Sequence, residues 1–183
     1  GLSENVLKIL GQKKNLRVLK YNHSEKNNIQ HLTFLQKTFL AQDENSKQLT
    51  KNDLKIVTKK KPSDQEIENL LFANQVCKHV KSNAIVVAKD NKTLGIGAGQ
   101  TSRVGSSEIA CDHATKFFFS ELKNCGAASD AFFPFADGLE KLIQIGVKSI
   151  IQPGGSVRDQ EVIDTADKAG ISMIFTKTRN FKH

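Results

Sequence analysis

The chain has 183 residues, of which 38% are hydrophobic and 25% charged, a composition typical of one globular domain with at most a small appended lobe. No apolar run approaches the roughly 20 residues of a membrane span, and no signal-peptide pattern opens the chain. We therefore expect a cytoplasmic protein without a membrane partner. Cys77, Cys111 and Cys125 have no CxxC spacing and an odd count, which predicts buried free thiols rather than disulfides.

The net charge of +8 is concentrated early, because residues 1–81 hold 15 Lys and Arg against 8 Asp and Glu. A basic segment favours polyanionic partners such as nucleic acid or phosphorylated metabolites. The lysine run at residues 59–61 is typical of a solvated face, and no basic motif is interleaved with aromatic residues. We therefore expect no nucleic-acid partner, and a nucleic-acid-binding domain is kept only as a third alternative.

The first part of the chain predicts short elements. Apolar residues at helical spacing predict a helix over residues 2–10, and alternation predicts a strand over residues 15–21. Residues 33–42 and 54–58 are expected to form further short strands or irregular apolar segments. A polar connection over residues 44–53 joins them.

A capping box marks the next helix, because Ser63 is followed three residues later by Glu66, and the helical pattern continues to about Lys81. Two strands over residues 82–89 and 93–99 then predict a β-hairpin. Three glycines alternate along the second of these strands: Gly95, Gly97 and Gly99. One face of that strand would be bare, which permits close approach by another backbone or by a flat ligand.

The rest of the chain alternates helices and strands. The expected helices cover residues 106–122, 135–145 and 159–169, and the expected strands cover residues 147–152 and 171–175. From the hairpin onward the order is β-β-α-β-α-β-α-β. This order predicts an α/β fold in which helices cover the faces of a layered sheet.

An aromatic stretch over residues 130–138 follows the end of a further strand. Its proline, Pro134, is predicted to lie in the first turn of the next helix, where a missing N–H costs nothing. Aromatic rings and carboxylates would then meet at a strand-to-helix junction, where α/β sheets bind ligands. The alternative is an ordinary aromatic cluster that closes the core, and some of the three phenylalanines are core residues in either case: Phe132, Phe133 and Phe135.

Five polar residues fall at strand ends or in loops between strands and helices: Asn83, Arg103, Asp137, Ser156 and Arg179. Loops that are positioned by a rigid sheet commonly carry ligand-binding groups. These residues are therefore the first candidates for a site.

Five motifs together resemble one known family. They are KSNAIV at residues 81–86, GIGAGQTSR at 95–103, SDAFFPFADG at 129–138, IIQPGGSVRDQEVID at 150–164 and RNFKH at 179–183. In order and spacing they resemble the bifunctional purine biosynthesis family, which joins phosphoribosylaminoimidazolecarboxamide formyltransferase to IMP cyclohydrolase. The resemblance covers essentially the whole chain and implies the C-terminal part of the formyltransferase unit of such an enzyme.

The resemblance also implies the fold, a cytidine-deaminase-like layered α/β/α sheet without the zinc site. Residues 1–61 would be the N-terminal connecting segment of the unit, and residues 62–183 its C-terminal lobe. The zinc signature of the deaminases is absent, because His113 is followed by Ala114 and Thr115 and no cysteine pair exists. We therefore expect no zinc.

The resemblance further implies which residues bind the two substrates. Contacts to the aminoimidazole carboxamide ribotide fall on Asn83, Arg103, Phe132 and Arg179, with Asn83 orienting the reacting amine. Contacts to the folate cosubstrate, 10-formyltetrahydrofolate, fall on Val104, Asp137, Ser156 and Val157.

These residue types suit formyl transfer. The substrate amine is a weak nucleophile because its lone pair is delocalised, so the site must position amine and formyl group, remove a proton and stabilise an oxyanion. Arg103 and Arg179 fit phosphate or carboxamide oxygens, and Phe132 can stack on a flat ring. Asp137 can accept hydrogen bonds from pterin amines, and backbone N–H groups around Ser156 can cradle an anion or a carbonyl.

Each assignment has a structural alternative. Asn83 can simply cap the hairpin, and Arg103 can form a surface ion pair. Asp137 can be a solvated acid on its helix. Asp130 can cap the helix that follows it.

The proton-accepting histidine of the family and its neighbouring lysine lie in an upstream Lys-His motif that nothing here matches, because Lys78-His79 stands in a late helical turn. We therefore expect that this chain alone does not catalyse formyl transfer, and the cyclohydrolase domain is not in it. Val80 and Ala84 replace hydroxyl residues where some family members hold a monovalent cation, so a full cation site is not expected.

The resemblance implies a homodimer whose sites lie between subunits, and exposed apolar surface would favour association. The alternative function is a non-catalytic module of the same fold that binds a phosphorylated metabolite. A thermal shift with ligand but without turnover would favour that alternative.

Overall fold

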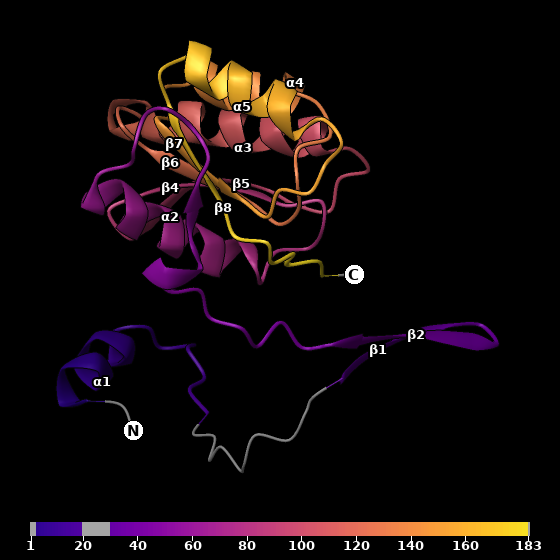
Figure 1. The fold of residues 1–183 in the computed structure, drawn as a ribbon. Coiled ribbons are helices and arrows are strands. Elements are labelled where there is room, and N and C mark those ends of the chain that lie inside the picture. Colours follow the sequence, from indigo (N-terminus) through magenta and orange to yellow (C-terminus); the bar gives the residue numbers. More distant parts are fainter. Residues whose placement is uncertain (1–2, 20–29, 183) are drawn as a thin grey trace. The chain divides into compact units, whose positions relative to one another are not determined.

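The computed structural model describes residues 3–19 and 30–182. The chain forms two compact units, Gly1–Glu44 and Asn45–His183, which are described separately (Figure 1). The predicted domain boundary after residue 61 stays a prediction.

The described part of the first unit, residues 3–19 and 30–44, contains one helix and one hairpin. Helix α1 (Glu4–Gly11) begins where the Ser3 side chain accepts a hydrogen bond from the backbone N–H of Val6 at 3.4 Å. Strands β1 (Gln30–Leu35) and β2 (Thr38–Asp43) pair antiparallel. The predicted helix and the strands expected within residues 33–42 are thus confirmed.

The strand predicted over residues 15–21 is wrong for residues 15–19, which are irregular and exposed. Residues 20–21 lie outside the described residues. A strand needs a neighbour that takes up its backbone hydrogen bonds. Among the strands of the described ranges, none pairs with this segment, so the alternation of apolar and polar residues does not lead to a strand here.

Six strands form the sheet of the second unit: β3 (Lys55–Ile56), β4 (Ile85–Lys89), β5 (Lys92–Gly97), β6 (Gly126–Ser129), β7 (Ser149–Gln152) and β8 (Ser172–Phe175). Their spatial order is β3-β8-β7-β6-β4-β5. β6, β7 and β8 are mutually parallel, whereas β4 pairs antiparallel with β5 and β6, and β3 pairs antiparallel with β8. The sheet is therefore mixed.

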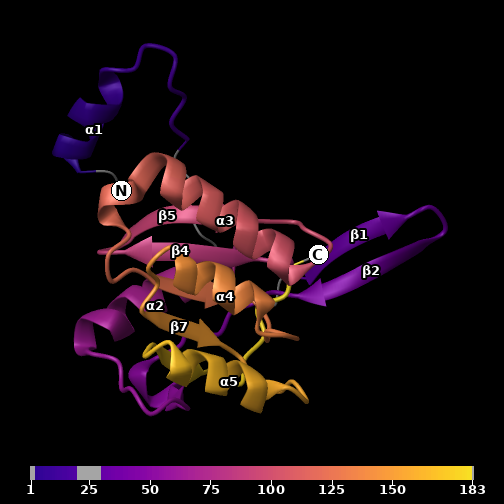
Figure 2. The same ribbon diagram turned by 90° about the horizontal axis from the view of Figure 1, so that it is seen from above.

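Helices cover both faces of this sheet (Figure 1). Helix α2 (Asp64–Cys77) packs on one face, mainly against β4 and β6. Helices α3 (Arg103–Phe118), α4 (Asp137–Gln144) and α5 (Asp159–Lys168) lie together on the other face, as Figure 2 also shows. The predicted order β-β-α-β-α-β-α-β and the α/β class are confirmed, and the likeness to cytidine deaminases stays a prediction.

Two apolar cores hold these layers together. Leu70 and Cys77 of α2 pack with Val86 and Ile151 on one side of the sheet. Phe133, with side chains from β4, β7 and the three other helices, fills the opposite side. Each fully buried Leu, Ile or Phe stabilises the fold by about 1.5–3 kcal/mol relative to an exposed position.

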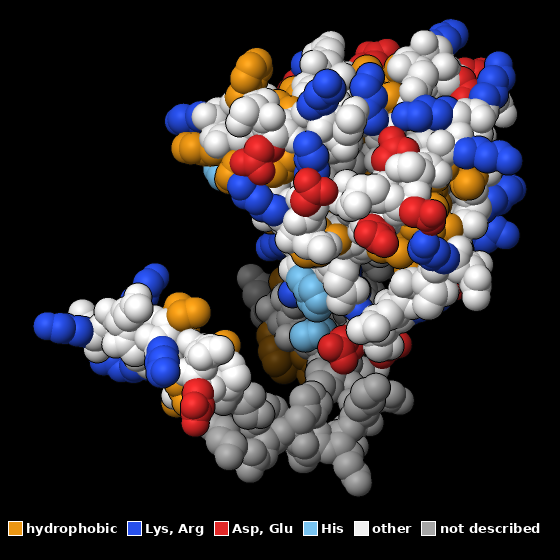
Figure 3. All heavy atoms as spheres, turned by 90° about the vertical axis from the view of Figure 1, so that its left-hand side faces the viewer, with side chains coloured by type: hydrophobic (Ala, Val, Ile, Leu, Met, Phe, Trp, Pro, Cys, Tyr) orange, Lys and Arg blue, Asp and Glu red, His pale blue; other side chains and the backbone are white. Residues whose placement is uncertain are grey.

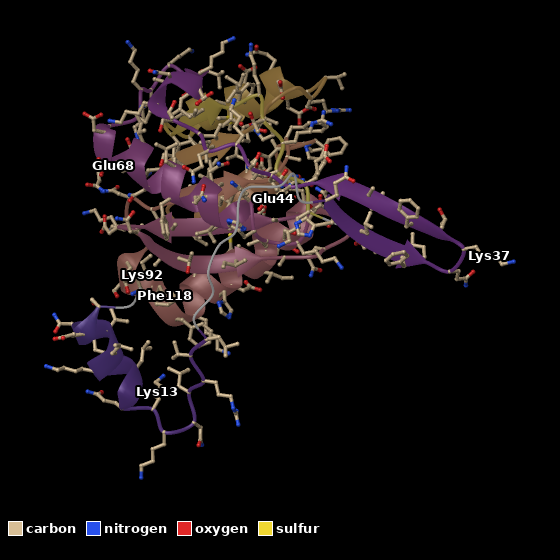
Figure 4. The ribbon with its side chains drawn as sticks, turned by 90° about the horizontal axis from the view of Figure 1, so that it is seen from below. Lys13, Lys37, Glu44, Glu68, Lys92 and Phe118 are labelled. Carbon is tan, nitrogen blue, oxygen red and sulfur yellow. The ribbon has the colours of Figure 1, made fainter. Side chains whose placement is uncertain are left out.

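Contacts of Lys92, the first residue of β5, lie at the edge of the core that contains Phe133. The ammonium group of Lys92 lies 4.6 Å from the ring centre of Phe118, at the C-terminal end of α3 (Figure 4). The same ammonium group forms an ion pair with Glu121 at 2.8 Å, in the short 3-10 turn Phe119–Glu121 that follows the helix. These contacts tie the end of α3 to the edge strand.

The bare face predicted for the second hairpin strand lies against a helix rather than a ligand. A Cβ atom at Gly95 would lie 2.0 Å from the carbonyl oxygen of Ala110, and one at Gly97 would lie 1.9 Å from that of Ser106. The backbone of α3 therefore rests directly on β5. This close approach fixes where α3 begins, and so where Arg103 stands.

Three predicted helix ends are corrected by tertiary contacts. Helix α2 keeps its predicted capping box at Ser63 but ends at Cys77, four residues before Lys81. Helix α3 begins three residues earlier than predicted, at Arg103. Helix α4 begins only at Asp137, so Pro134 is not in its first turn. The preceding segment is held out of the helix by a local hydrogen bond from the Ser129 hydroxyl to the carbonyl of Ala131 and by a bond from the Phe133 N–H to the distant Gln152 side chain.

The three cysteines are free and buried, as predicted. Burial is the main cause that raises the pKa of the Cys111 thiol to about 12 and that of Cys125 to about 11, and it also raises the pKa of Cys77. Within the described ranges, no helix combines the length and apolar character that crossing a bilayer requires.

Substituting Gly97→Ala is expected to lower the free energy of unfolding by about 3 kcal/mol, because the new methyl group would force α3 away from β5. Urea denaturation followed by circular dichroism measures the change. An unchanged midpoint would show that α3 does not rest on this strand.

Native protein at pH 8 is expected to react slowly with a thiol reagent such as dithionitrobenzoate, and all three thiols are expected to react at once in urea, because only the thiolate is reactive. Rapid labelling of a fully folded chain would contradict this account.

Since the thiol pKa values are raised in the folded state, the free energy of unfolding should fall as pH rises from about 9 to about 12.

Candidate functional site

A pocket of about 450 Å³ opens where the loop before β4, the start of α3 and the segment between β6 and α4 meet. Its lining residues are Asn83, Thr101, Ser102, Arg103, Val104, Ala131, Phe132, Pro134, Phe135, Asp137 and Phe181. Asn83 precedes β4 and residues 101–104 follow β5, whereas residues 131–137 follow β6. Phe181 comes from the end of the chain. Pockets of this size hold small molecules.

Asn83 and Arg103 are joined at the centre of one wall. The Nη2 of Arg103 donates to the Oδ1 of Asn83 at 2.9 Å, and the Nδ2 of Asn83 donates to the carbonyl oxygen of Gln100 at 2.9 Å. The hydroxyl of Ser106 donates to the backbone carbonyl of Asn83 at 2.8 Å. The Asn83 amide is thereby held in one orientation, with one N–H left for a ligand.

Arg103 forms a buried ion pair, where the sequence allowed a surface one. Its Nη1 donates to the Oδ1 of Asp130 and, at 2.8 Å, to the hydroxyl of Ser129. The side chain of Arg103 is 6% exposed and that of Asp130 is fully buried. A buried carboxylate of this kind needs its partner, because leaving one charge unpaired in the interior costs several kcal/mol.

The aromatic stretch divides between core and pocket. Phe133 is buried in the core, and its backbone N–H donates to the Oε1 of Gln152 at 3.0 Å. Phe132 and Phe135 line the pocket, and Phe135 is 48% exposed. The hydrogen bond to Gln152 anchors the backbone at the ring that points inward. The prediction that some of the three phenylalanines are core residues is confirmed for Phe133, and ligand binding at this junction stays a prediction.

Arg179 reaches the pocket by way of Phe132. Its guanidinium lies 5.2 Å from the ring centre of Phe132 and 6.0 Å from that of Phe181, which is within the range of cation–π attraction. Arg179 is exposed, so its remaining donors face solvent. One face of Phe132 is covered by this cation.

The residues predicted to bind folate are split. Val104 and Asp137 line the pocket, whereas Ser156 and Val157 do not. Their loop meets the pocket only through the guanidinium of Arg158, which lies 4.8 Å from the ring centre of Phe135.

The predicted anion cradle around Ser156 is already filled by the chain itself. The backbone N–H groups of Gly155 and Ser156 donate to the carboxylate of Asp159 at 2.7 and 3.1 Å. An anionic ligand would have to displace Asp159 to reach these donors. The carboxylate of Asp159, the first residue of α5, therefore folds back onto the loop that precedes the helix.

Asp130 does not cap the following helix, which begins seven residues later at Asp137 and whose N-cap residue, Ala136, makes no side-chain cap. Lys78-His79 follows the end of α2 and is not among the pocket residues. The ammonium group of Lys78 donates instead to the carbonyl of Lys47 at 3.4 Å. His183 lies outside the described residues. Among residues 3–19 and 30–182, no three His, Cys, Asp or Glu side chains stand together as a metal ion would need.

A second hollow of about 370 Å³ lies between α3 and α4. An ion pair at its edge joins the ammonium of Lys141 to the carboxylate of Glu108 at 3.0 Å. None of the predicted site residues lines it.

Basic and acidic side chains are mixed on the surface (Figure 3). Within the lysine run at residues 59–61, Lys60 pairs with Glu66 at 3.3 Å. The run is thus partly neutralised by its own helix. The arrangement favours the solvated-face interpretation.

The family model of the AICARFT/IMPCHase bienzyme matches residues 1–113. The chain belongs to this family. Its relatives include the bifunctional purine biosynthesis protein PurH of Oceanobacillus iheyensis, which is 47% identical over the whole chain and 35% of its own length. The PurH of Chlorobium phaeobacteroides is 48% identical over 98% of the chain and 34% of its own length, and that of Aquifex aeolicus is 47% identical over 98% and 35%.

The resemblance drawn from the motifs is thereby confirmed, and the chain spans about a third of the length of these relatives. The family model ends within α3, so the pocket residues after His113 are covered by the relatives alone.

Sequence reasoning missed the lining residue Phe181 and the buried partners that hold the neighbouring segments. Asp130 was considered as an acid of the aromatic junction or as a helix cap, not as the partner of Arg103, and neither Ser82 nor Gln152 was a candidate. A signal existed for Asp130, since a carboxylate at the end of a buried strand needs a cation, but the partner lies 27 residues away.

Substituting Arg103→Met is expected to lower the free energy of unfolding by about 3–5 kcal/mol, because Asp130 would stay buried without its partner. The matched control, Lys141→Met, breaks an ion pair whose side chains are about half exposed, and should change stability by less than about 1 kcal/mol. Urea denaturation compares the two variants. Equal effects would contradict the buried pair.

Proposed function

We propose that this chain is the C-terminal part of a phosphoribosylaminoimidazolecarboxamide formyltransferase. It takes part in moving the formyl group of 10-formyltetrahydrofolate to the 5-amino group of aminoimidazole carboxamide ribotide in purine biosynthesis. The observation that carries the proposal is one pocket lined by five of the eight expected residues: Asn83, Arg103, Val104, Phe132 and Asp137.

The ribotide would lie along the wall that holds Asn83 and Arg103. Because Arg103 already neutralises Asp130, its role in the proposal is to hold the Asn83 amide toward the carboxamide and amine of the substrate. Arg179 is exposed and has free donors toward solvent, so it is the better partner for the phosphate. Phe132, with Arg179 on one face, offers its remaining surface to the imidazole ring.

The folate would occupy the side formed by Val104 and Phe135. The apolar surface there suits a flat ring, and the exposed carboxylate of Asp137 can accept hydrogen bonds from pterin amines. Ser156 and Val157 would meet the folate only beyond Phe135, where Arg158 touches the rim.

The pocket lacks an evident proton acceptor for the amine. Among the described residues that line it, there is no histidine and no lysine, and the one carboxylate, Asp137, accepts a hydrogen bond from the N–H of Gly138 at 2.6 Å. We propose that the proton acceptor comes from outside this chain. Binding without turnover is the expected behaviour of the chain alone.

The cytidine-deaminase-like fold, the homodimer and the cytoplasmic location belong to the same proposal. Exposed aromatic residues at the end of α3, Phe117 and Phe119, support association, because they are 57% and 77% exposed. The second candidate function is a non-catalytic module that binds a phosphorylated metabolite, which the absence of a histidine from the described pocket favours.

Calorimetry with two ligands separates the candidates. The formyltransferase proposal predicts that the chain binds both the ribotide and tetrahydrofolate, each altering the affinity for the other, without formyl transfer. The binding-module alternative predicts binding of the ribotide only. If neither ligand binds, or if the chain alone turns over like an intact enzyme, the proposal is wrong in its present form.

Substituting Arg179→Ala is expected to weaken ribotide binding about 10- to 100-fold, since a charge-assisted hydrogen bond to phosphate contributes about 1.5–3 kcal/mol. Lys116→Ala is the control, because Lys116 also covers an exposed aromatic ring, Phe117, but outside the pocket. Calorimetric titration compares both with the unaltered chain. Equal affinities for all three would remove Arg179 from the site.

A further inference from the structure

Asp130 uses both of its carboxylate oxygens inside the protein. Its Oδ1 accepts from Arg103, and its Oδ2 accepts from the hydroxyl of Ser82. The side chain is fully buried, so these donors replace water completely. A charge in this position holds its partners in fixed places, because moving any donor away leaves the carboxylate unsatisfied.

Ser82 connects Asp130 to the end of the chain by hydrogen bonds. The backbone N–H of Lys182 donates to the Ser82 hydroxyl at 3.0 Å, and the backbone N–H of Ser82 donates to the carbonyl of Lys182 at 3.0 Å. The backbone carbonyl of Asp130 accepts from the N–H of Asn180 at 2.8 Å. Asp130 therefore contacts the last residues twice, once directly and once through Ser82.

Residues 179–182, which we call the C-terminal strap, have no helix or strand of their own. Side-chain hydrogen bonds also hold the strap. The Nδ2 of Asn180 donates to the Oδ1 of Asn74 at 3.1 Å, and the Nδ2 of Asn45 donates to the carbonyl of Phe181 at 3.0 Å. The ammonium group of Lys182 donates to the carbonyl of His79 at 3.3 Å. The position of the strap thus depends on individual backbone and side-chain hydrogen bonds rather than on a regular backbone ladder.

The strap supplies part of the pocket. Phe181 is one of the lining residues, and Arg179 lies over Phe132. Arg103, at the other end of the same hydrogen-bonded chain, also lines the pocket. The path Arg103–Asp130–Ser82–Lys182 therefore joins two parts of the pocket lining that are far apart in sequence.

We propose that Asp130 is a positioning residue that couples Arg103 to the C-terminal strap through Ser82. The proposal rests on the proposed function only for the identity of the ligand. Asp130 does not touch the ligand itself. It sets the distance between the Asn83–Arg103 wall and the wall made by Arg179 and Phe181, and so the shape that the ribotide meets.

The first test needs no ligand. Hydrogen exchange of the full chain, followed by NMR, reports separately on the amides of Asn180 and Lys182. Substituting Ser82→Ala, or Asp130→Asn, should speed exchange at both amides at least tenfold while amides of β7 change less than twofold. Ser82→Thr keeps the hydroxyl and should restore protection of the strap.

A control removes a hydroxyl elsewhere. Thr165→Ala deletes a side chain that donates to the carbonyl of Glu161 within α5, and should leave the strap amides unchanged. Unchanged exchange at Asn180 and Lys182 in both Ser82→Ala and Asp130→Asn would overturn the coupling. An equal rise in exchange at the strap and in β7 would also overturn it, because Asp130 would then only stabilise the fold.

The second test adds the ribotide. Ser82→Ala, which alters no lining residue, should weaken calorimetric affinity at least fivefold, and Ser82→Thr should recover it. Loosened strap amides with unchanged affinity would overturn the positioning role. If the unaltered chain binds no ribotide, the proposed function fails, and hydrogen exchange still decides the coupling.

Discussion

The buried charge pair of Arg103 and Asp130 constrains the parts of the second unit that form the pocket. Arg103 is the first residue of α3, and Asp130 follows the last residue of β6, so the pair ties the helix layer to the end of a central strand. Both groups are removed from water, so neither can be displaced without leaving the other unsatisfied. The Asn83 amide takes its orientation from this pair.

The pair depends in turn on how closely α3 lies against the sheet. The glycines at positions 95 and 97 let the helix backbone touch β5, where any side chain would collide with a carbonyl oxygen. A helix held further away would carry Arg103 out of reach of Asp130. The repeated glycines thus act through helix packing, although their pattern also resembles that of a loop around a ligand. The packing of α3 on β5 at these two glycines thus bears on the position of a pocket-lining residue, Arg103.

The fold could be predicted further than the site. The capping box at Ser63 and the alternation of helices and strands after residue 82 depend on neighbouring residues, and both are confirmed. The late start of α4 was missed because Gln152, distant in sequence, binds the N–H of Phe133. The Asp159 carboxylate in the predicted anion cradle was missed for a different reason, since Asp159 is close in sequence but was read only as the start of a helix, whereas a short turn brings it back onto the amides of Gly155 and Ser156. The family resemblance located the pocket residues, but only geometry showed that Arg103 serves Asp130 first.

An NMR titration of the chain with aminoimidazole carboxamide ribotide would show where the ligand lies relative to the pocket that contains Arg103. We expect the largest shifts at the amides of Asn83, Val104 and Phe132, which line the pocket, and of Arg179, which lies over Phe132. Shifts confined to the hollow between α3 and α4, around Glu108 and Lys141, would contradict this expectation.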